Sequence, residues 1–237
     1  MKIKPQAGPQ TEFLKSKADI AIYGGSAGGG KSWALLMEVL FHVHNPEFGG
    51  VIFRRTSPQV RNEGGMWDES SKIYPLIGAS PKESILEWNF ESGSKIKFAH
   101  LEHEKNIYDW QGAQIPFIGF DEVTHFTKKQ FFYLLSRNRS TCGIKPYIRA
   151  TTNPDADSWV AEFISWYIDQ DTGLPIKERS GLIRWFAVIN DKTVWGNTPE
   201  EIKTEYGEDV IPKSFTFIAG TGSIPLKLIG ETVRKAG

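Results

Sequence analysis

The sequence predicts an α/β fold in which helices flank a mainly parallel sheet. Short strand-like runs alternate with helical segments along most of the 237 residues, which is the pattern of strand–helix–strand units. The run Ile115–Phe120 is apolar almost throughout, as expected of a parallel strand covered on both faces. A third indication is the glycine-rich stretch over residues 23–31, which joins a strand-like run to a helical one.

The first part of the chain supplies three of these elements. Residues 1–17 contain two prolines and several lysines, and we expect them to form a lead-in segment. Alternating residues over Ala18–Gly25 predict a strand. The apolar stretch Lys31–His44 predicts a buried helix, which the following Asn-Pro pair ends. A second strand is expected over Gly50–Thr56.

Three further elements follow. Two alternating runs over Ile85–Leu101 surround the sequence Ser-Gly-Ser and predict a β-hairpin. Ile115–Glu122 predicts a buried strand that ends in two acids, and Tyr147–Pro154 predicts a strand that ends in polar residues. A chain of 237 residues can bury a large core, so we expect one principal domain with a small appendage rather than two full domains.

Composition excludes several classes of protein. Basic and acidic residues number 28 each, so the chain is not a uniformly basic nucleic-acid binder, and any DNA contact must be local. The single cysteine, Cys142, excludes an internal disulfide framework and agrees with a reducing cytoplasm. No apolar run is long enough to cross a bilayer and no leader begins the chain, so we expect neither membrane insertion nor secretion.

The glycine-rich stretch matches the phosphate-binding pattern G-x-x-x-x-G-K-[ST], in which Lys31 and Ser32 follow Gly30. Bare backbone N–H groups wrap phosphates at such a turn, and the helix start adds partial positive charge. We expect Lys31 to reach the outer phosphates of ATP and the Ser32 hydroxyl to bind Mg²⁺. The predicted nucleotide-binding residues are Gly25, Ser26, Ala27, Gly28, Gly29, Gly30, Lys31 and Ser32.

The acid pair Asp121 and Glu122 separates an ATPase from other phosphate-binding proteins. Asp121, at the end of an apolar strand, is the expected carboxylate that holds Mg²⁺. Glu122 is placed to polarise the attacking water as a general base, which a kinase does not need. The alternative is a pair of surface acids that cap a strand. The guanine-binding signature N-K-x-D is absent, so the predicted catalytic residues Lys31, Asp121 and Glu122 indicate ATP hydrolysis.

Thr151, Thr152 and Asn153 lie at the tip of a third predicted strand. Ligands of open α/β sheets bind at the carboxyl ends of the strands. These polar groups are therefore candidates to sense the terminal phosphate and couple its loss to movement. The alternative is that they only cap the strand before Pro154. The residues by themselves do not decide between the two.

Five stretches of the sequence form a recognisable combination: GPQTEFLKSKADIAIYGGSAGGGKSWALL, VIFRRTSPQVR, IYDWQGAQIPFIGFDEVTHF, LLSRNRS and ATTNP. Together they resemble the ATPase half of the large terminase subunit of tailed bacteriophages. Their order and approximate spacing match over residues 8–190. The phosphate-binding loop is generic, whereas its combination with GFDE and TTNP is specific.

This resemblance implies a P-loop NTPase of the RecA/ASCE-like class. The implied function is a motor that pumps double-stranded DNA into a procapsid through a portal protein. Its implied partners are a small terminase subunit and further copies in a homo-oligomeric ring, in the host bacterial cytoplasm. The resemblance also assigns Gln10 to the adenine side of the nucleotide and Thr151–Asn153 to coupling.

The charge-stabilising arginine of phosphoryl transfer stays unassigned. Many terminases carry a basic residue where this chain has Ser26, and others carry an arginine where it has Gln111. The best local basic stretch, RRTSPQVR, is expected to face DNA or a neighbouring subunit. The candidates for an arginine finger or a DNA contact are Arg54, Arg55, Arg61, Arg137 and Arg139.

The resemblance divides the chain into an ATPase core over residues 1–190, a partial lid or linker over 191–219 and a tail over 220–237 that does not match the family. The family's nuclease domain does not follow, so we expect no DNA cleavage. Two alternatives stay open. The first is another P-loop DNA-dependent ATPase of helicase or recombinase type, and the second is a remnant that binds nucleotide without turnover.

Overall fold

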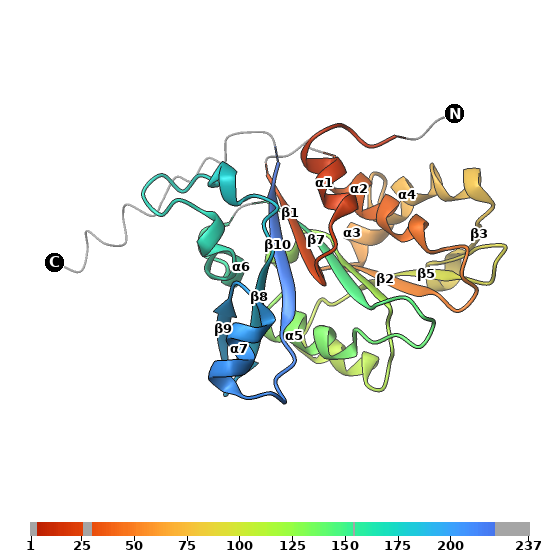
Figure 1. Cartoon of the computed structure of the whole chain (residues 1–237). Coiled ribbons are helices and arrows are strands. Elements are labelled where there is room, and N and C mark those ends of the chain that lie inside the picture. Colours follow the sequence, from red (N-terminus) through yellow and green to blue (C-terminus); the bar gives the residue numbers. More distant parts are fainter. Residues whose placement is uncertain (1–3, 26–29, 154, 221–237) are drawn as a thin grey trace.

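The computed structural model describes residues 4–25, 30–153 and 155–220 (Figure 1). Its strands form one ten-stranded sheet in the order β3-β4-β5-β2-β6-β7-β1-β10-β8-β9. The strands are β1 (Ile20–Gly24), β2 (Gly49–Arg54), β3 (Ser80–Lys82), β4 (Glu87–Asn89), β5 (Lys95–His100), β6 (Phe117–Phe120), β7 (Tyr147–Thr152), β8 (Arg184–Ile189), β9 (Lys192–Gly196) and β10 (Lys213–Ala219).

Helices flank this sheet, and short 3₁₀ turns join several elements. The α-helices are α1 (Pro9–Lys15), α2 (Lys31–Glu38), α3 (Ser57–Arg61), α4 (Met66–Ser71), α5 (Lys128–Arg137), α6 (Trp159–Phe163) and α7 (Pro199–Tyr206). The 3₁₀ turns are η1 (Val39–Phe41), η2 (Tyr74–Ile77), η3 (Glu83–Ile85), η4 (Glu104–Trp110), η5 (Val123–His125), η6 (Ser165–Tyr167) and η7 (Lys177–Arg179). Within the described ranges, no helix has the length and apolarity needed to span a bilayer.

The six central strands, from β5 to β10 in the sheet order, are parallel, and an antiparallel pair is added at each side. This confirms the predicted α/β fold with a mainly parallel sheet, and β4 and β5 confirm the predicted hairpin. The strand β7 lies between β1, which leads into the glycine-rich turn, and β6, which precedes the acid pair. Three carboxyl strand ends therefore meet side by side.

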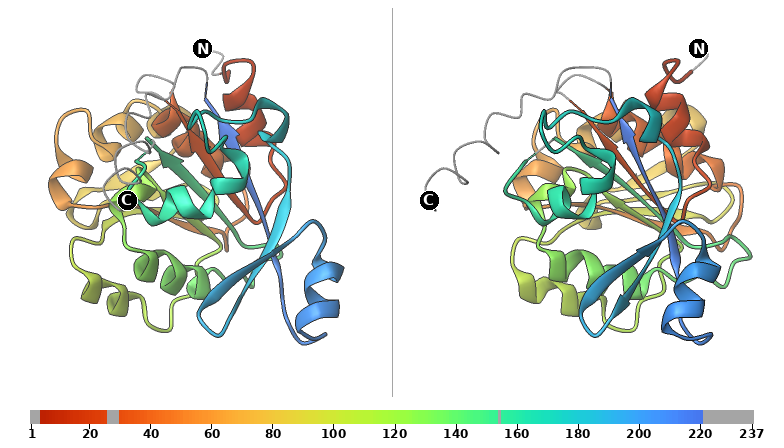
Figure 2. Two further views of the ribbon diagram at one scale, coloured as in Figure 1. Left: turned by 90° about the vertical axis from the view of Figure 1, so that its left-hand side faces the viewer. Right: turned by 60° about the vertical axis from the view of Figure 1, so that its left-hand side comes forward.

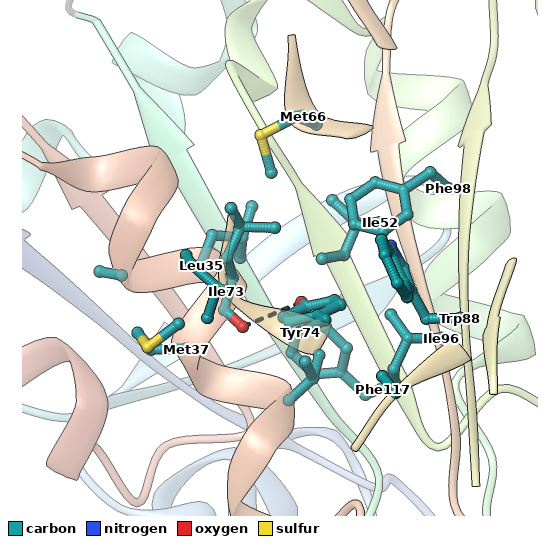
Figure 3. Packing of buried hydrophobic residues seen from close by; sticks show 14 of the residues in the cluster. Leu35, Met37, Ile52, Met66, Ile73, Tyr74, Trp88, Ile96, Phe98 and Phe117 are labelled. Carbon is teal, nitrogen blue, oxygen red and sulfur yellow. Dashed lines mark hydrogen bonds between the residues drawn. The ribbon is translucent and has the colours of Figure 1, made fainter. Parts of the chain in front are cut away.

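Alternate residues of the strands face two separate hydrophobic cores. Ile52 of β2 lies in the core beneath α1 to α4, whereas its neighbours Val51 and Phe53 lie in the core beneath α5 and α6. Figures 1 and 2 show these two groups of helices on opposite faces of the sheet. In the first core the Tyr74 hydroxyl donates a hydrogen bond to the Leu36 carbonyl oxygen at 2.9 Å (Figure 3).

The position of β10 corrects one expectation from the sequence. The resemblance predicts a partial lid or linker over residues 191–219, but β10 is hydrogen-bonded in parallel to β1, with Ile22 opposite Phe217. The Asp19 carboxylate accepts hydrogen bonds from the Ser214 backbone N–H and hydroxyl, both at 2.9 Å. This strand therefore belongs to the centre of the sheet, whereas β8, β9 and α7 lie together at its edge (Figure 2).

The lead-in segment also differs from its prediction, because it contains α1. Gly8 precedes this helix with a φ of 89°, and Pro9 occupies its first turn, where the missing N–H of proline costs nothing. Phe13 of α1 is wholly buried and packs against the ring of Tyr23. The helix thereby presents Gln10, which is 3% exposed, to the start of α2.

Candidate nucleotide and metal site

Gly25 follows β1, and Gly30, at the other end of the glycine-rich stretch, precedes α2. Gly30 has a φ of 63°, in the left-handed region that favours glycine, and α2 begins at the next residue. The Gln10 side-chain amide donates to the Gly30 carbonyl oxygen at 3.0 Å, which ties α1 to this turn. Four residues of the predicted phosphate loop, Ser26, Ala27, Gly28 and Gly29, lie outside the described residues.

Lys31 lies at the start of α2 and is 7% exposed. Its ammonium donates to the Gly25 carbonyl oxygen and to Asn153 Oδ1, both at 3.0 Å. Burial lowers the pKa of this ammonium from its usual value, while the carboxylates of Glu122 and Asp121 oppose that change. The sheet thus brings together a cation from α2 and an amide that follows β7.

Asp121 follows β6 and is wholly buried. Its Oδ1 accepts hydrogen bonds from the Ser32 hydroxyl at 2.9 Å and the Thr151 hydroxyl at 2.7 Å. Its Oδ2 lies 2.8 Å from Arg54 Nε in an ion pair. The carboxylate therefore has partners from α2, β7 and β2. A buried charge requires such pairing and hydrogen bonding, because burial without partners is costly.

Glu122 adopts a φ of 60°, which is uncommon for a residue with a side chain and is typical of functional positions. Its backbone N–H donates to the Thr151 hydroxyl at 2.9 Å. Its carboxylate accepts from the Asn153 backbone N–H at 3.0 Å and from the Asn153 side-chain amide at 2.6 Å. Asn153 therefore contacts both Lys31 and Glu122.

The three residues at the tip of β7 do not behave alike. Thr151 and Asn153 join the network around the acids. Thr152 is 1% exposed, and its hydroxyl donates to the Asn153 carbonyl oxygen at 2.9 Å. That contact is a local side-chain cap of the strand end, the alternative considered above for residues 151–153. Coupling remains a prediction for Thr151 and Asn153.

Of the five candidate arginines, the structure brings Arg54 to this site. Arg55 turns away, and its guanidinium donates to the Leu101 carbonyl oxygen at 2.9 Å and to Gln130 Oε1 at 2.8 Å. Arg61 is exposed on α3. Successive residues of a strand point to opposite faces, which separates Arg54 from Arg55.

The other two arginines lie near the amino end of β6, whereas Asp121 follows its carboxyl end. The carbonyl oxygen of Arg137 accepts from the Ile115 N–H at 3.0 Å, beside the amino end of β6. The Arg139 Nε donates to the Ser136 carbonyl oxygen at 3.1 Å. Both lie at the end of α5, whereas Asp121 lies at the carboxyl end of β6. Within one subunit, these arginines are not part of the site.

The donor set fits Mg²⁺. Ser32 and Asp121 offer hard oxygen atoms in contact with each other, and Mg²⁺ is usually held by one or two protein groups together with substrate phosphates. Among the described residues, no group of three or more His, Cys, Asp or Glu side chains forms a closed metal cage. This pattern agrees with a metal that binds together with a nucleotide.

The site defines the class of P-loop ATPases: glycines precede a helix, a lysine begins that helix, and an acid pair follows a strand two positions away in the sheet. The family described as "Terminase large subunit, T4likevirus-type, N-terminal" matches residues 22–223. The chain therefore belongs to this family, the ATPase domain of the phage DNA-packaging motor. A search of curated proteins finds no match.

Solved structures share the fold. The large terminase ATPase domain of Thermus phage P74-26 has a TM-score of 0.54 and 14% identity, over 91% of this chain and 80% of that one. The large terminase of a thermophilic bacteriophage has a TM-score of 0.55 and 14% identity, over 98% and 50% of the two chains. The large terminase of bacteriophage HK97 has a TM-score of 0.52 and 14% identity, over 70% and 36%.

Proposed function

We propose that this chain hydrolyses ATP at the site formed by β1, β6, β7 and α2. Lys31 contacts the outer phosphates, Glu122 orients and polarises the attacking water, and Gln10 lies on the adenine side. The observation that carries this proposal is the contact of Asp121 with Ser32 from α2 and Thr151 from β7. It supports a metal-binding carboxylate beside the phosphate-binding turn.

Ser32 and Asp121 would hold Mg²⁺. Bound there, the ion would supply positive charge that offsets the negative charge of the phosphates. The protein's own contribution is to exclude water from Asp121, which is wholly buried, and to keep its Oδ1 directed at Ser32. A hydroxyl and a carboxylate that already contact each other need little rearrangement to share a cation.

We also propose that Asn153 couples the nucleotide state to the rest of the molecule, with support from Thr151. Asn153 accepts a hydrogen bond from Lys31 and donates two to Glu122. If Lys31 turns to a terminal phosphate, its bond to Asn153 is lost, and the hold of Asn153 on Glu122 changes with it. This chain of contacts supports a link between phosphate binding and the freedom of the general base.

Steady-state hydrolysis by the wild type and the Glu122→Gln variant tests the assignment. We expect the rate to fall about 10²- to 10⁴-fold, the usual contribution of a general base, while nucleotide binding persists. Glu102→Gln, which removes an exposed acid, is the matched control and keeps the wild-type rate. Equal rates in the wild type and Glu122→Gln would refute the hydrolytic assignment.

The family assignment supports a finer proposal for the biological task. The chain acts as a homo-oligomeric ring in the bacterial cytoplasm, receives genomes from a small terminase subunit and drives double-stranded DNA through a portal protein into a procapsid. Its DNA contacts are expected to be made to phosphates and to weaken with salt. Stimulation of the ATPase by duplex DNA supports this proposal, whereas stimulation by single strands alone favours a helicase-type or recombinase-type enzyme.

A further inference from the structure

We infer that Arg54 is a positioning residue for the metal site and acts through Asp121. This inference rests on the proposed function, because it concerns the same carboxylate. Among the described residues, Asp121 Oδ2 has no hydrogen-bond partner, and its contact is Arg54 Nε at 2.8 Å. The two hydroxyls at Oδ1 are neutral, so the guanidinium supplies a positive charge in direct contact with this buried carboxylate.

The backbone holds the two partners in register. Phe53 and Phe120 are paired on the parallel strands β2 and β6, and the next residues along the chain are Arg54 and Asp121. The Asp121 N–H donates to the Phe53 carbonyl oxygen at 3.0 Å, which extends the ladder to the acid itself. The ion pair is therefore built on rigid elements, as a precise binding site requires.

The face of β2 decides which arginine takes this role. Arg54 is two residues after Ile52 and therefore faces the same side of the sheet. Ile52 lies in the core beneath α2, the helix that contains Ser32. Arg55 points to the opposite face and contacts Gln130 of α5. The two neighbouring arginines thus form a matched pair: Arg54 contacts the metal carboxylate, and Arg55 contacts a loop and a helix.

Arg54 fixes the rotation of the carboxylate. With Oδ2 held by the guanidinium, Oδ1 is directed at the Ser32 hydroxyl. In Arg54→Gln the charge is lost, and Oδ2 is left buried without compensation. The carboxylate is then expected to turn toward other donors, which misplaces one of the two groups assigned to the metal.

The test measures binding of a fluorescent, non-hydrolysable ATP analogue, with Mg²⁺ and with a chelator, so that turnover is not needed. The wild type is expected to bind more tightly with Mg²⁺. In Arg54→Gln this Mg²⁺-dependent gain is expected to shrink about 10- to 100-fold, as for other partners that orient metal ligands. Affinity in the chelator is expected to stay close to the wild-type value, which also verifies that the site is folded.

Two further variants complete the experiment. Arg54→Lys keeps a cation on the same strand end and is expected to restore part of the gain, whereas Arg55→Gln is expected to keep all of it. If Arg54→Gln shows the same Mg²⁺-dependent increase in affinity as the wild type, or a larger one, the inference is overturned. The arginine would then either have no effect on the metal site or compete with the metal. An equal loss of affinity with and without Mg²⁺ would also overturn it. Absence of any Mg²⁺ effect in the wild type would instead refute the proposed metal site.

Discussion

Because Glu38 is buried, we predict that the free energy of unfolding falls as the pH rises through the weakly acidic range. This residue ends α2 and is 3% exposed. Its Oε1 lies 3.2 Å from Arg149 Nε, and its Oε2 has no hydrogen-bond partner among the described residues. Burial raises the pKa of the Glu38 carboxyl from 4.5 to about 7, although Arg149 opposes the rise. The perturbation that exposes this effect is Glu38→Gln, which cannot titrate.

The sign follows from proton binding. Between the pKa of the unfolded chain and that of the folded protein, folded Glu38 retains a proton that the unfolded chain has lost, so stability falls as the pH rises. The difference between the two pKa values is about 7 − 4.5 = 2.5, which corresponds to ~3 kcal/mol at 1.36 kcal/mol per pKa unit. This stabilisation is fully present below the lower pKa and is lost above the higher one.

Urea unfolding of both proteins at several pH values measures the effect. From about pH 5.5 to about pH 8, the wild type is expected to lose ~2 kcal/mol relative to Glu38→Gln, because part of the titration lies below this interval. Other carboxyl groups titrate in both proteins and cancel in the difference. For Glu102→Gln, in which an exposed acid is removed, the free energy of unfolding should depend on pH as it does in the wild type. Parallel curves for the wild type and Glu38→Gln would refute the reasoning.

Three further predictions concern single contacts. Tyr74→Phe removes the hydrogen bond to the Leu36 carbonyl oxygen, and the free energy of unfolding is expected to fall by ~1 kcal/mol in urea titrations. Gly24→Ala places a Cβ atom against the buried Phe217 ring, so thermal unfolding should reveal a loss of ~1–3 kcal/mol. Ser32→Ala should lower Mg²⁺-dependent ATP hydrolysis by at least about tenfold, whereas Ser32→Thr, which keeps a hydroxyl, should retain it. Unchanged values in any of these assays contradict the contact concerned.

The local patterns of the sequence predicted the central strands and the acid pair because each depends on few neighbouring residues. The apolar run before Asp121 is a buried parallel strand, as expected. The helix α1 is not among the elements predicted from the sequence, although Pro9 in the first turn of a helix is a recognisable start signal. From the sequence, residues 1–17 are expected only to form a lead-in segment.

Other features depend on pairings that no local pattern specifies. The run Lys213–Ala219 forms a strand, but its partner β1 lies about two hundred residues earlier, so the run falls within the lid or linker predicted from the sequence. The choice between Arg54 and Arg55 required knowledge of which face of β2 lies beneath α2. The buried pair of Glu38 and Arg149 joins the end of a helix to a central strand. Sequence patterns show none of these partners because each depends on the order of strands in the sheet.

The pairing of β10 with β1 has a consequence for biosynthesis. One side of β1 stays unpaired until Lys213–Ala219 has left the ribosome, and the Asp19–Ser214 contact spans 195 residues. At about 5–20 residues per second, that interval is on the order of 10 to 40 s. Throughout this interval β1 lacks at least one of its two neighbouring strands, and an unpaired strand edge is a known risk for aggregation. A lower growth temperature or added chaperones are therefore expected to raise the soluble yield of the protein.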